Sequence, residues 1–202
     1  MQITSEPLPN RLVKITLDND GEYIIPKGVH RRLSSDEYPD EHTFLLELCE
    51  ATETYARNKT AYLLGLKPYT RKKLYENLIK SGVDEEIAED ILDEFEQAGY
   101  INDEKYAADM LNIYINEKFY SIEYAIYKLE ERGISKATSQ KIADEIEINE
   151  TETALKLLNK KIGTALESNY KKMSNLLTRY GYQSDAQKEA IDMFINNTTH
   201  SI

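Results

Sequence analysis

The stretch GYINDEKYAADMLNIYINEKFYSIEYAIYKLEERGI, residues 99–134, decides the fold of this chain. Its apolar residues recur at spacings of three and four, which is typical of helices with one buried face. They form two stripes: Tyr106, Ala107, Met110, Leu111 and Tyr114, followed by Ile122, Ala125, Ile126 and Leu129. Ser121 lies where a side chain caps a helix, and Gly133 lies where a left-handed C-terminal cap is expected. The stretch therefore predicts two helices joined by a tight turn, and each needs a neighbour to bury its stripe.

A related pattern occurs on both sides of this stretch. Four pairs match at a constant offset of 51 residues: Tyr69 with Tyr120, Thr70 with Ser121, Leu78 with Leu129, and Gly82 with Gly133. Leu177 and Gly181 match the last two pairs at a further 48 residues. A period of about 50 residues predicts tandem three-helix repeats, and such repeats stack into elongated, curved bodies.

The apolar pattern and the positions of prolines and glycines separate a short N-terminal part from a helical remainder. The segment RLVKITLDNDGEYII, residues 11–25, alternates apolar and polar residues on both sides of Asn19-Asp20-Gly21, which predicts a β-hairpin. All five prolines precede residue 69, and six of the eight glycines fall at the ends of apolar-periodic segments. The rest of the chain is therefore expected to be a string of helices.

These patterns predict a mainly α fold: three tandem three-helix repeats in an elongated curved rod, preceded by a short N-terminal β-hairpin. The expected divisions are residues 1–40 for the hairpin and linker, and 41–101, 102–148 and 149–202 for the three repeats. Helices are expected at about 41–64, 70–80 and 84–97 in the first repeat and at 135–146 at the end of the second. In the third they are expected at about 149–162, ending at Gly163, at about 168–180, and from Ser184 onward.

Composition indicates a protein partner more than nucleic acid. The 202 residues carry a net charge of −11, which argues against binding nucleic acid through bulk electrostatics. The charge is uneven, because Asp84 to Glu96 holds eight acidic residues and no basic one, whereas Thr151 to Tyr182 holds six basic and two acidic residues. Apolar runs are too short to span a bilayer, and the start lacks the features of a signal peptide, so a cytoplasmic location is expected.

Signals for catalysis or for a cofactor are missing from the sequence. Cys49 is the single cysteine, and His30, His42 and His200 lie far apart, which argues against a disulfide or a metal site. Phosphate-binding loops and nucleophile elbows are also missing. We therefore expect no enzyme activity, no cofactor, no metal and no small-molecule substrate.

The run GYINDEKYAADML, followed by YAIYKLEERGIS, resembles the central signature of the RecX regulatory proteins, which modulate the RecA recombinase. The likeness covers roughly Tyr55 to Phe194. Members usually have glycine just before the second helix of this unit, where this chain has Glu117, Lys118 and Phe119. The resemblance implies a monomeric, non-catalytic regulator of DNA repair, homologous recombination and the SOS response. Such a regulator docks along a groove of the RecA nucleoprotein filament and lowers its ATP hydrolysis and strand exchange, with DNA inside the filament as a second candidate partner.

Basic and aromatic side chains are the candidates for partner contact. They are Arg71, Lys72, Lys73, Tyr124, Tyr127, Arg132, Lys160, Lys161, Lys171, Lys172 and Arg179. Tyr124 and Tyr127 lie off the main apolar stripe, and tyrosine is frequent at interfaces. The basic residues have an ordinary alternative role as solvated helix faces or as favourable charges near helix C-termini.

Two other functions remain open from the sequence. One is a stand-alone helical DNA-binding module that uses the basic third repeat, and its affinity for bare DNA would fall steeply with salt. The other is a general protein-interaction scaffold, because three-helix units occur in many unrelated binding proteins.

Overall fold

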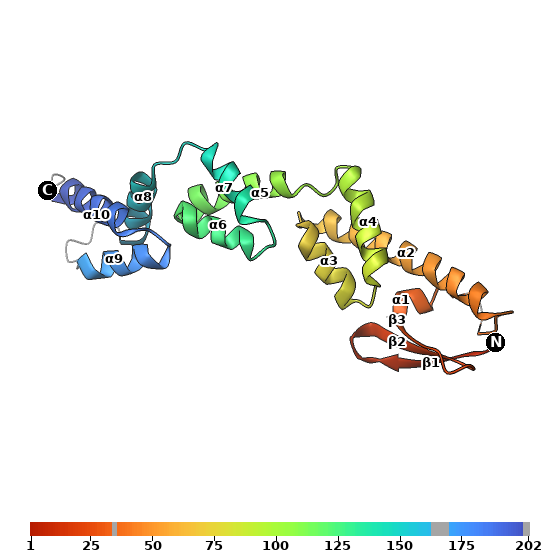
Figure 1. The fold of residues 1–202 in the computed structure, drawn as a ribbon. Coiled ribbons are helices and arrows are strands. Elements are labelled where there is room, and N and C mark those ends of the chain that lie inside the picture. The colour runs from red at the N-terminus through yellow and green to blue at the C-terminus, as the bar shows by residue number, and fades with distance from the viewer. Residues whose placement is uncertain (34–35, 163–169, 200–202) are drawn as a thin grey trace. The chain divides into compact units, whose positions relative to one another are not determined.

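A computed structural model describes residues 1–33, 36–162 and 170–199. The described chain is mainly helical, with a small sheet at its N-terminal end (Figure 1). It divides into two compact units, Met1–Asn102 and Asp103–Ile202. None of the helices in the described ranges is both long enough and apolar enough to cross a membrane.

The sheet has three antiparallel strands in the order β1 (Ile3–Leu8), β2 (Leu12–Leu17) and β3 (Glu22–Pro26). The predicted hairpin is confirmed as β2 and β3, with Val13 opposite Ile25 and Ile15 opposite Tyr23. Strand β1 was not predicted, because five of its six residues are not fully buried and it lacks a clear alternation. Pro7 lies in this strand, where an edge position tolerates the missing N–H.

Three long helices complete the first unit: α2 (Glu41–Leu66), α3 (Arg71–Lys80) and α4 (Glu85–Gln97), with the single turn α1 (Lys27–His30) before them. Side-chain caps start each long helix. Asp40 accepts from the backbone N–H of Thr43 at 2.7 Å, Thr70 from that of Lys73 at 3.3 Å, and Asp84 from that of Glu86 at 2.9 Å. The N-terminal half of α2 packs on the sheet through Phe44, and the following half packs on α3 and α4.

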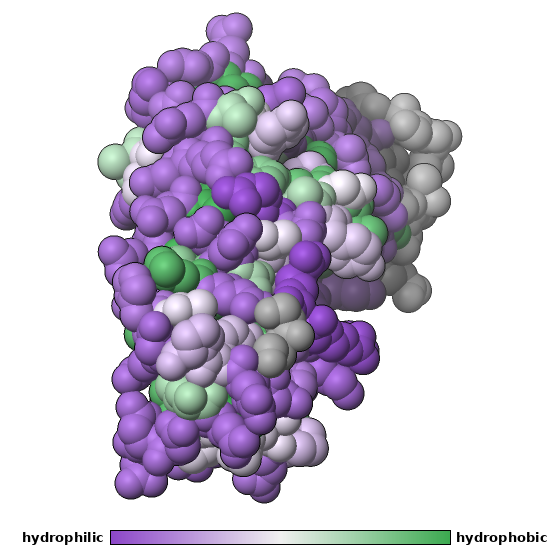
Figure 2. All heavy atoms as spheres, turned by 90° about the vertical axis from the view of Figure 1, so that its right-hand side faces the viewer, coloured by the Kyte–Doolittle hydropathy of each residue, from purple (hydrophilic) through white to green (hydrophobic). Residues whose placement is uncertain are grey.

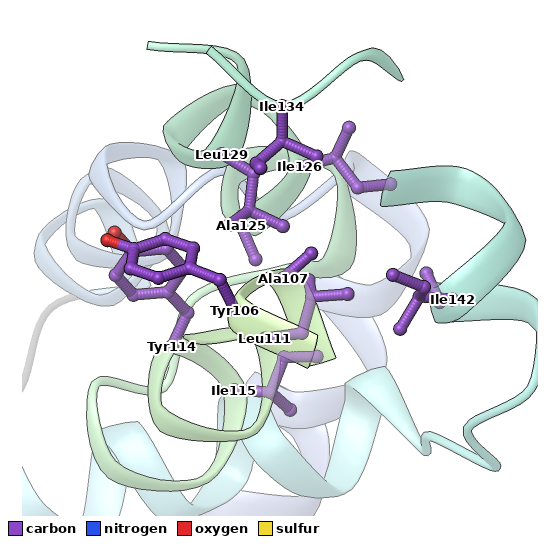
Figure 3. Packing of buried hydrophobic residues seen from close by; sticks show 11 residues of the cluster. Tyr106, Ala107, Leu111, Tyr114, Ile115, Ala125, Ile126, Leu129, Ile134 and Ile142 are labelled. Carbon is purple, nitrogen blue, oxygen red and sulfur yellow. The ribbon is translucent and has the colours of Figure 1, made fainter. Parts of the chain in front are cut away.

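Within its described residues, the second unit has six helices and one π-helical turn. They are α5 (Asp103–Asn112), the π-helical turn Ile113–Glu117, α6 (Ile122–Glu130), α7 (Lys136–Asp144), α8 (Glu150–Ile162), α9 (Tyr170–Arg179) and α10 (Ser184–Thr199). Elements α5 to α7 share one apolar cluster, shown in Figure 3, and α8 to α10 share another. The helix end predicted at Gly163 and the start predicted at Ser168 lie outside the described residues.

The turn after the second helix of each predicted repeat has one geometry. Gly82, Gly133 and Gly181 have φ of +87°, +96° and +89°. In each case the N–H of the following buried residue bonds to a leucine carbonyl five positions earlier: Val83 to Leu78, Ile134 to Leu129 and Tyr182 to Leu177. These are left-handed helix caps of the Schellman type. The paired positions of the repeat therefore share a backbone geometry, and the division into three repeats stays a prediction.

Candidate interaction surface

Five tyrosine rings are in contact on and around α6, and we call them the tyrosine array. They are Tyr114, Tyr120, Tyr124, Tyr127 and Tyr180. The Tyr120 ring lies at the centre, with centroids 4.9 Å from Tyr124, 5.6 Å from Tyr180 and 5.8 Å from Tyr114. Tyr124 and Tyr127 stack at 6.0 Å with an interplanar angle of 19°. A spacing of three along α6 places Tyr124 and Tyr127 on one side of the helix, and Tyr120 lies just before the N-cap Ser121.

The outer end of the array is open to solvent. Tyr127 is 49% exposed and Tyr124 is half-buried. The ammonium of Lys128 lies 5.3 Å from the Tyr124 ring centroid and 5.4 Å from that of Tyr127, within the range of a cation–π contact. Its Nζ also pairs with Glu131 at 2.7 Å, and the Tyr127 hydroxyl donates to Glu131 at 3.1 Å. The exposed end is therefore aromatic, with its local charges paired.

Hydrogen bonds at this end shift three pKa values in consistent directions. Lys128 and Tyr127 each donate a hydrogen bond to Glu131, and this bond raises the pKa of each donor. The same two bonds lower the pKa of Glu131, and the bond from Lys128 has the larger effect. The bonds stabilise the charged forms of Lys128 and Glu131 and the neutral form of Tyr127. Lys128 and Glu131 therefore stay ionised at neutral pH and fix the orientation of the Tyr127 hydroxyl.

The inner end of the array is anchored by Arg132. Its Nε donates to the Tyr114 hydroxyl at 2.8 Å and its Nη1 to the Tyr106 hydroxyl at 2.7 Å. Figure 3 shows these two hydroxyls side by side at the edge of the apolar cluster. Burial acts to lower the pKa of Arg132, but the two tyrosines outweigh it and raise that pKa. Arg132 therefore joins the turn after α6 to α5 and the π-helical turn.

The turn that leads into α6 uses an unusual residue. Phe119 has φ of +58°, the left-handed conformation that favours glycine, and the N–H of Tyr120 bonds to the Tyr114 carbonyl at 2.9 Å as in a helix cap. Other groups hold the phenylalanine in place. The ammonium of Lys160 lies 4.8 Å from its ring centroid, and the Tyr182 hydroxyl donates to its carbonyl at 3.0 Å. Phe119 therefore forms the left-handed turn in place of the expected glycine, and its ring adds a contact to Lys160 of α8.

Phe119→Gly and Phe119→Ala separate these two effects. Both substitutions remove the ring and its contact with Lys160, but only glycine also relieves the left-handed strain. We expect the glycine variant to be more stable than the alanine variant by about 1 kcal/mol. Urea denaturation of the two proteins measures this difference, and equal midpoints with equal slopes would contradict the assigned turn.

The remaining basic candidates are dispersed. Arg71 forms ion pairs with Glu89 at 2.5 Å, with Glu96 at 3.1 Å and with Asp93. Lys73 pairs with Glu76 at 2.8 Å, and Lys72 is exposed; all three basic residues belong to the first unit. The others are exposed on α8 and α9 of the second unit: Lys160, Lys161, Lys171, Lys172 and Arg179.

The structure therefore brings Tyr124 and Tyr127 together and adds residues that the sequence analysis missed. Lys128 was missed although it follows Tyr124 by four positions, a spacing that places the two on one helix face. Tyr180 was missed because its contact with Tyr120 joins positions 60 residues apart. Across the described ranges, no group of His, Cys, Asp and Glu side chains is arranged to hold a metal ion.

The fold and this surface define a mainly helical protein whose candidate site is an exposed aromatic surface. Residues 56–95 match the family model described as RecX, first three-helix domain. Two proteins from Streptococcus pneumoniae named regulatory protein RecX are 28% and 29% identical over 200 residues, covering 95% of this chain and 76% of each relative. Over nearly its whole length the chain is therefore similar to proteins named regulatory protein RecX, and its residues 56–95 match a RecX domain.

Solved structures show the same fold. A crystal structure of regulatory protein RecX has a TM-score of 0.65 at 20% identity, covering 95% of this chain and 98% of that one. A crystal structure of RecX from Lactobacillus salivarius has a TM-score of 0.63 at 17% identity, covering 71% of this chain and 96% of that one. The predicted mainly helical fold with a short N-terminal β-hairpin is confirmed.

Proposed function

We propose that this protein regulates the RecA recombinase by binding the RecA nucleoprotein filament and lowering its ATP hydrolysis and strand exchange. The observation that carries the proposal is the likeness to proteins named regulatory protein RecX, which extends over 95% of the chain. The function is regulatory rather than catalytic, and the partner is the recombinase, as the resemblance of Gly99 to Ile134 implies.

The candidate surface supports a protein partner. Tyrosine presents a large apolar ring with a polar tip, and interfaces are enriched in it. At the exposed end of the tyrosine array, Lys128 is paired with Glu131, so this patch offers ring faces rather than net positive charge. Docking on DNA phosphates needs unpaired positive charge, and this patch therefore favours a protein surface.

Regulation of this kind requires unequal affinity for two filament states. A bound protein shifts an equilibrium only by the difference between its affinities for the two states. A tenfold shift toward a slowly hydrolysing state needs a difference of about 1.4 kcal/mol. A few contacts that form in one filament state only, such as those of an exposed tyrosine ring, are enough to supply it.

Cosedimentation tests the proposal directly. The protein is pelleted with RecA filaments on single-stranded DNA, with bare single-stranded DNA and with free RecA, while ATP hydrolysis and strand exchange are followed. Selective pelleting with filaments and slowed hydrolysis are the expected results. Normal hydrolysis and strand exchange at saturating protein contradict the proposal, and equal, salt-sensitive pelleting with bare DNA supports the DNA-binding module instead.

Two tyrosine substitutions locate the interaction in the same assay. Tyr127→Ala removes the exposed ring of the array, and we expect filament binding to weaken by about tenfold. Tyr62→Ala is the matched control, because Tyr62 is 67% exposed on α2 of the other unit. Equal binding by both variants would exclude the tyrosine array as the contact surface.

A further inference from the structure

The first unit contains an apolar groove that the tyrosine surface does not involve, and we call it the α2–β3 groove. It has a volume of about 560 Å³ and is lined by residues of β3, of α2 and of the segment from the end of α3 to the start of α4. Its apolar lining includes Ile24, Leu45, Leu48, Ile79 and Ile87, and Cys49 also lines it. All of these residues lie inside the unit Met1–Asn102.

Apolar side chains at the mouth of this groove are open to solvent. Ile24 is 58% exposed and Leu45 is 36% exposed. On the face that Figure 2 shows, hydrophilic residues predominate and hydrophobic ones occur in small, separate spots. Ile24 also lies on β3, which is an edge strand of the sheet. Exposed apolar residues at a strand edge and beside a groove mark a place for a partner.

Negative charge surrounds the same groove. Asp84 and Glu85 line it and are exposed. Asp84 is engaged as the cap of α4, whereas the Glu85 carboxylate forms no ion pair with any residue in the described part of the chain. Glu53 accepts a hydrogen bond from the Cys49 thiol at 3.6 Å. Burial raises the pKa of Cys49, and Glu53, Glu86 and Asp84 raise it further, so their negative field extends to the thiol.

We propose that the α2–β3 groove binds a segment of the recombinase filament that inserts an apolar side chain between Ile24 and Leu45 and places a lysine or arginine against Glu85. The inference rests on the proposed function for the identity of the partner. The chemical character of this segment follows from complementarity. The α2–β3 groove is apolar and has the Glu85 carboxylate at its margin, so it favours a segment with an apolar side chain next to a positive charge. The groove is a second contact that is independent of the tyrosine array.

Cys49 gives a direct measurement, since it is the only cysteine in the chain. The protein is treated with a maleimide at mildly alkaline pH, where the raised pKa still allows reaction, with and without RecA filaments on single-stranded DNA. Modification of the Cys49 peptide is followed by mass spectrometry. We expect filaments to slow it by about tenfold, as burial in an interface requires. Leu46→Cys in a Cys49→Ser background is the control, because Leu46 is 59% exposed on the same helix but outside the groove.

Substitutions then test the apolar contact and the charge contact separately. Leu45→Asp places a charge in the α2–β3 groove, and Glu85→Lys reverses the charge at the margin of the groove. Each substitution is expected to weaken filament binding by about tenfold. Leu46→Asp and Asp90→Lys are matched controls on α2 and α4 and are expected to bind normally. Circular dichroism confirms that each variant is folded.

The outcomes separate this inference from the proposed function. If the unsubstituted protein pellets with filaments but Cys49 is not protected, and Leu45→Asp binds like Leu46→Asp, the groove proposal is wrong while the function stands. If the unsubstituted protein does not pellet with filaments, the proposed function fails and the groove assignment fails with it. Protection of Cys49 together with weakened binding of Leu45→Asp and Glu85→Lys supports both.

Discussion

Gly181→Ala is expected to lower the free energy of unfolding by about 3 kcal/mol. The residue has φ of +89°, and a left-handed alanine costs about 1–2 kcal/mol. A Cβ at this position would also lie 2.6 Å from the Ser121 Oγ and closer still to the Tyr124 Cβ. Relief of such a clash requires movement of backbone in a packed region, which typically costs another 1–3 kcal/mol.

The clash lies at the contact between α6 and the turn from α9 to α10. The N–H of Ser121 donates to the Tyr180 carbonyl at 3.0 Å, and the Gln183 side chain donates to Glu123 at 2.6 Å. A shift of the turn away from α6 breaks these bonds and moves Tyr180 away from the tyrosine array. The variant is therefore expected to weaken filament binding as well.

Gly99→Ala is the matched control for backbone strain. Gly99 has φ of +76°, but a Cβ there would have no other atom within 4 Å. We expect a loss of about 1 kcal/mol, which is the conformational cost alone. Urea or thermal denaturation of both variants gives the comparison. Equal losses would show that the contact of Gly181 with α6 is looser than the structure indicates.

Helix positions were predictable because local signals determine them. Thr70, Asp84 and Ser121 each accept a backbone N–H in the first turn that follows them, as the sequence suggests for short polar residues at helix starts. The last helix starts where the sequence analysis expects it, but its first turn uses a side chain differently. The helix begins at Ser184 itself, and the Gln187 side chain turns inward to donate to the Tyr182 carbonyl at 2.7 Å. The same side chain also bonds to Ser174 and Thr178 of α9, so it contributes to the packing of α10 on α9.

The candidate site was less predictable because it depends on distant contacts. The sequence singled out Tyr124 and Tyr127 from the helix periodicity, but Tyr180 reaches the array only through tertiary packing. Basic residues illustrate the same limit. Arg71 was a candidate for partner contact together with Lys72 and Lys73, but its ion pairs to α4 depend on how α3 and α4 pack. Composition gives the sign of the charge in a region, whereas folding decides which charges are paired.

Arg71→Met is expected to lower the free energy of unfolding by about 2 kcal/mol at low salt. The guanidinium contacts three carboxylates on α4, those of Glu89, Asp93 and Glu96, and its side chain is only 26% exposed. Methionine keeps much of the apolar volume but leaves these carboxylates to repel one another. Hydrogen bonds to charged groups contribute about 1.5–3 kcal/mol, but solvent around the half-exposed carboxylates lowers the contribution of each ion pair, so the whole network is expected to contribute about as much as one such bond.

Arg57→Met is the control, because Arg57 contacts a single carboxylate of α4. Its Nη2 lies 2.9 Å from Glu94, and the two side chains are 44% and 52% exposed. We expect a loss below about 1 kcal/mol for this exposed pair.

Salt separates the two variants. In about 1 M salt the Debye length falls to about 3 Å, so repulsion among the α4 carboxylates is screened. The loss caused by Arg71→Met should shrink markedly there, while the small loss caused by Arg57→Met changes little in absolute terms. Equal, salt-independent losses would mean that the three ion pairs of Arg71 stabilise the unit no more than one pair does. A large, salt-sensitive loss would mean that the acidic face of α4 depends on Arg71, whose release for contact with a partner would then destabilise the packing of α3 on α4.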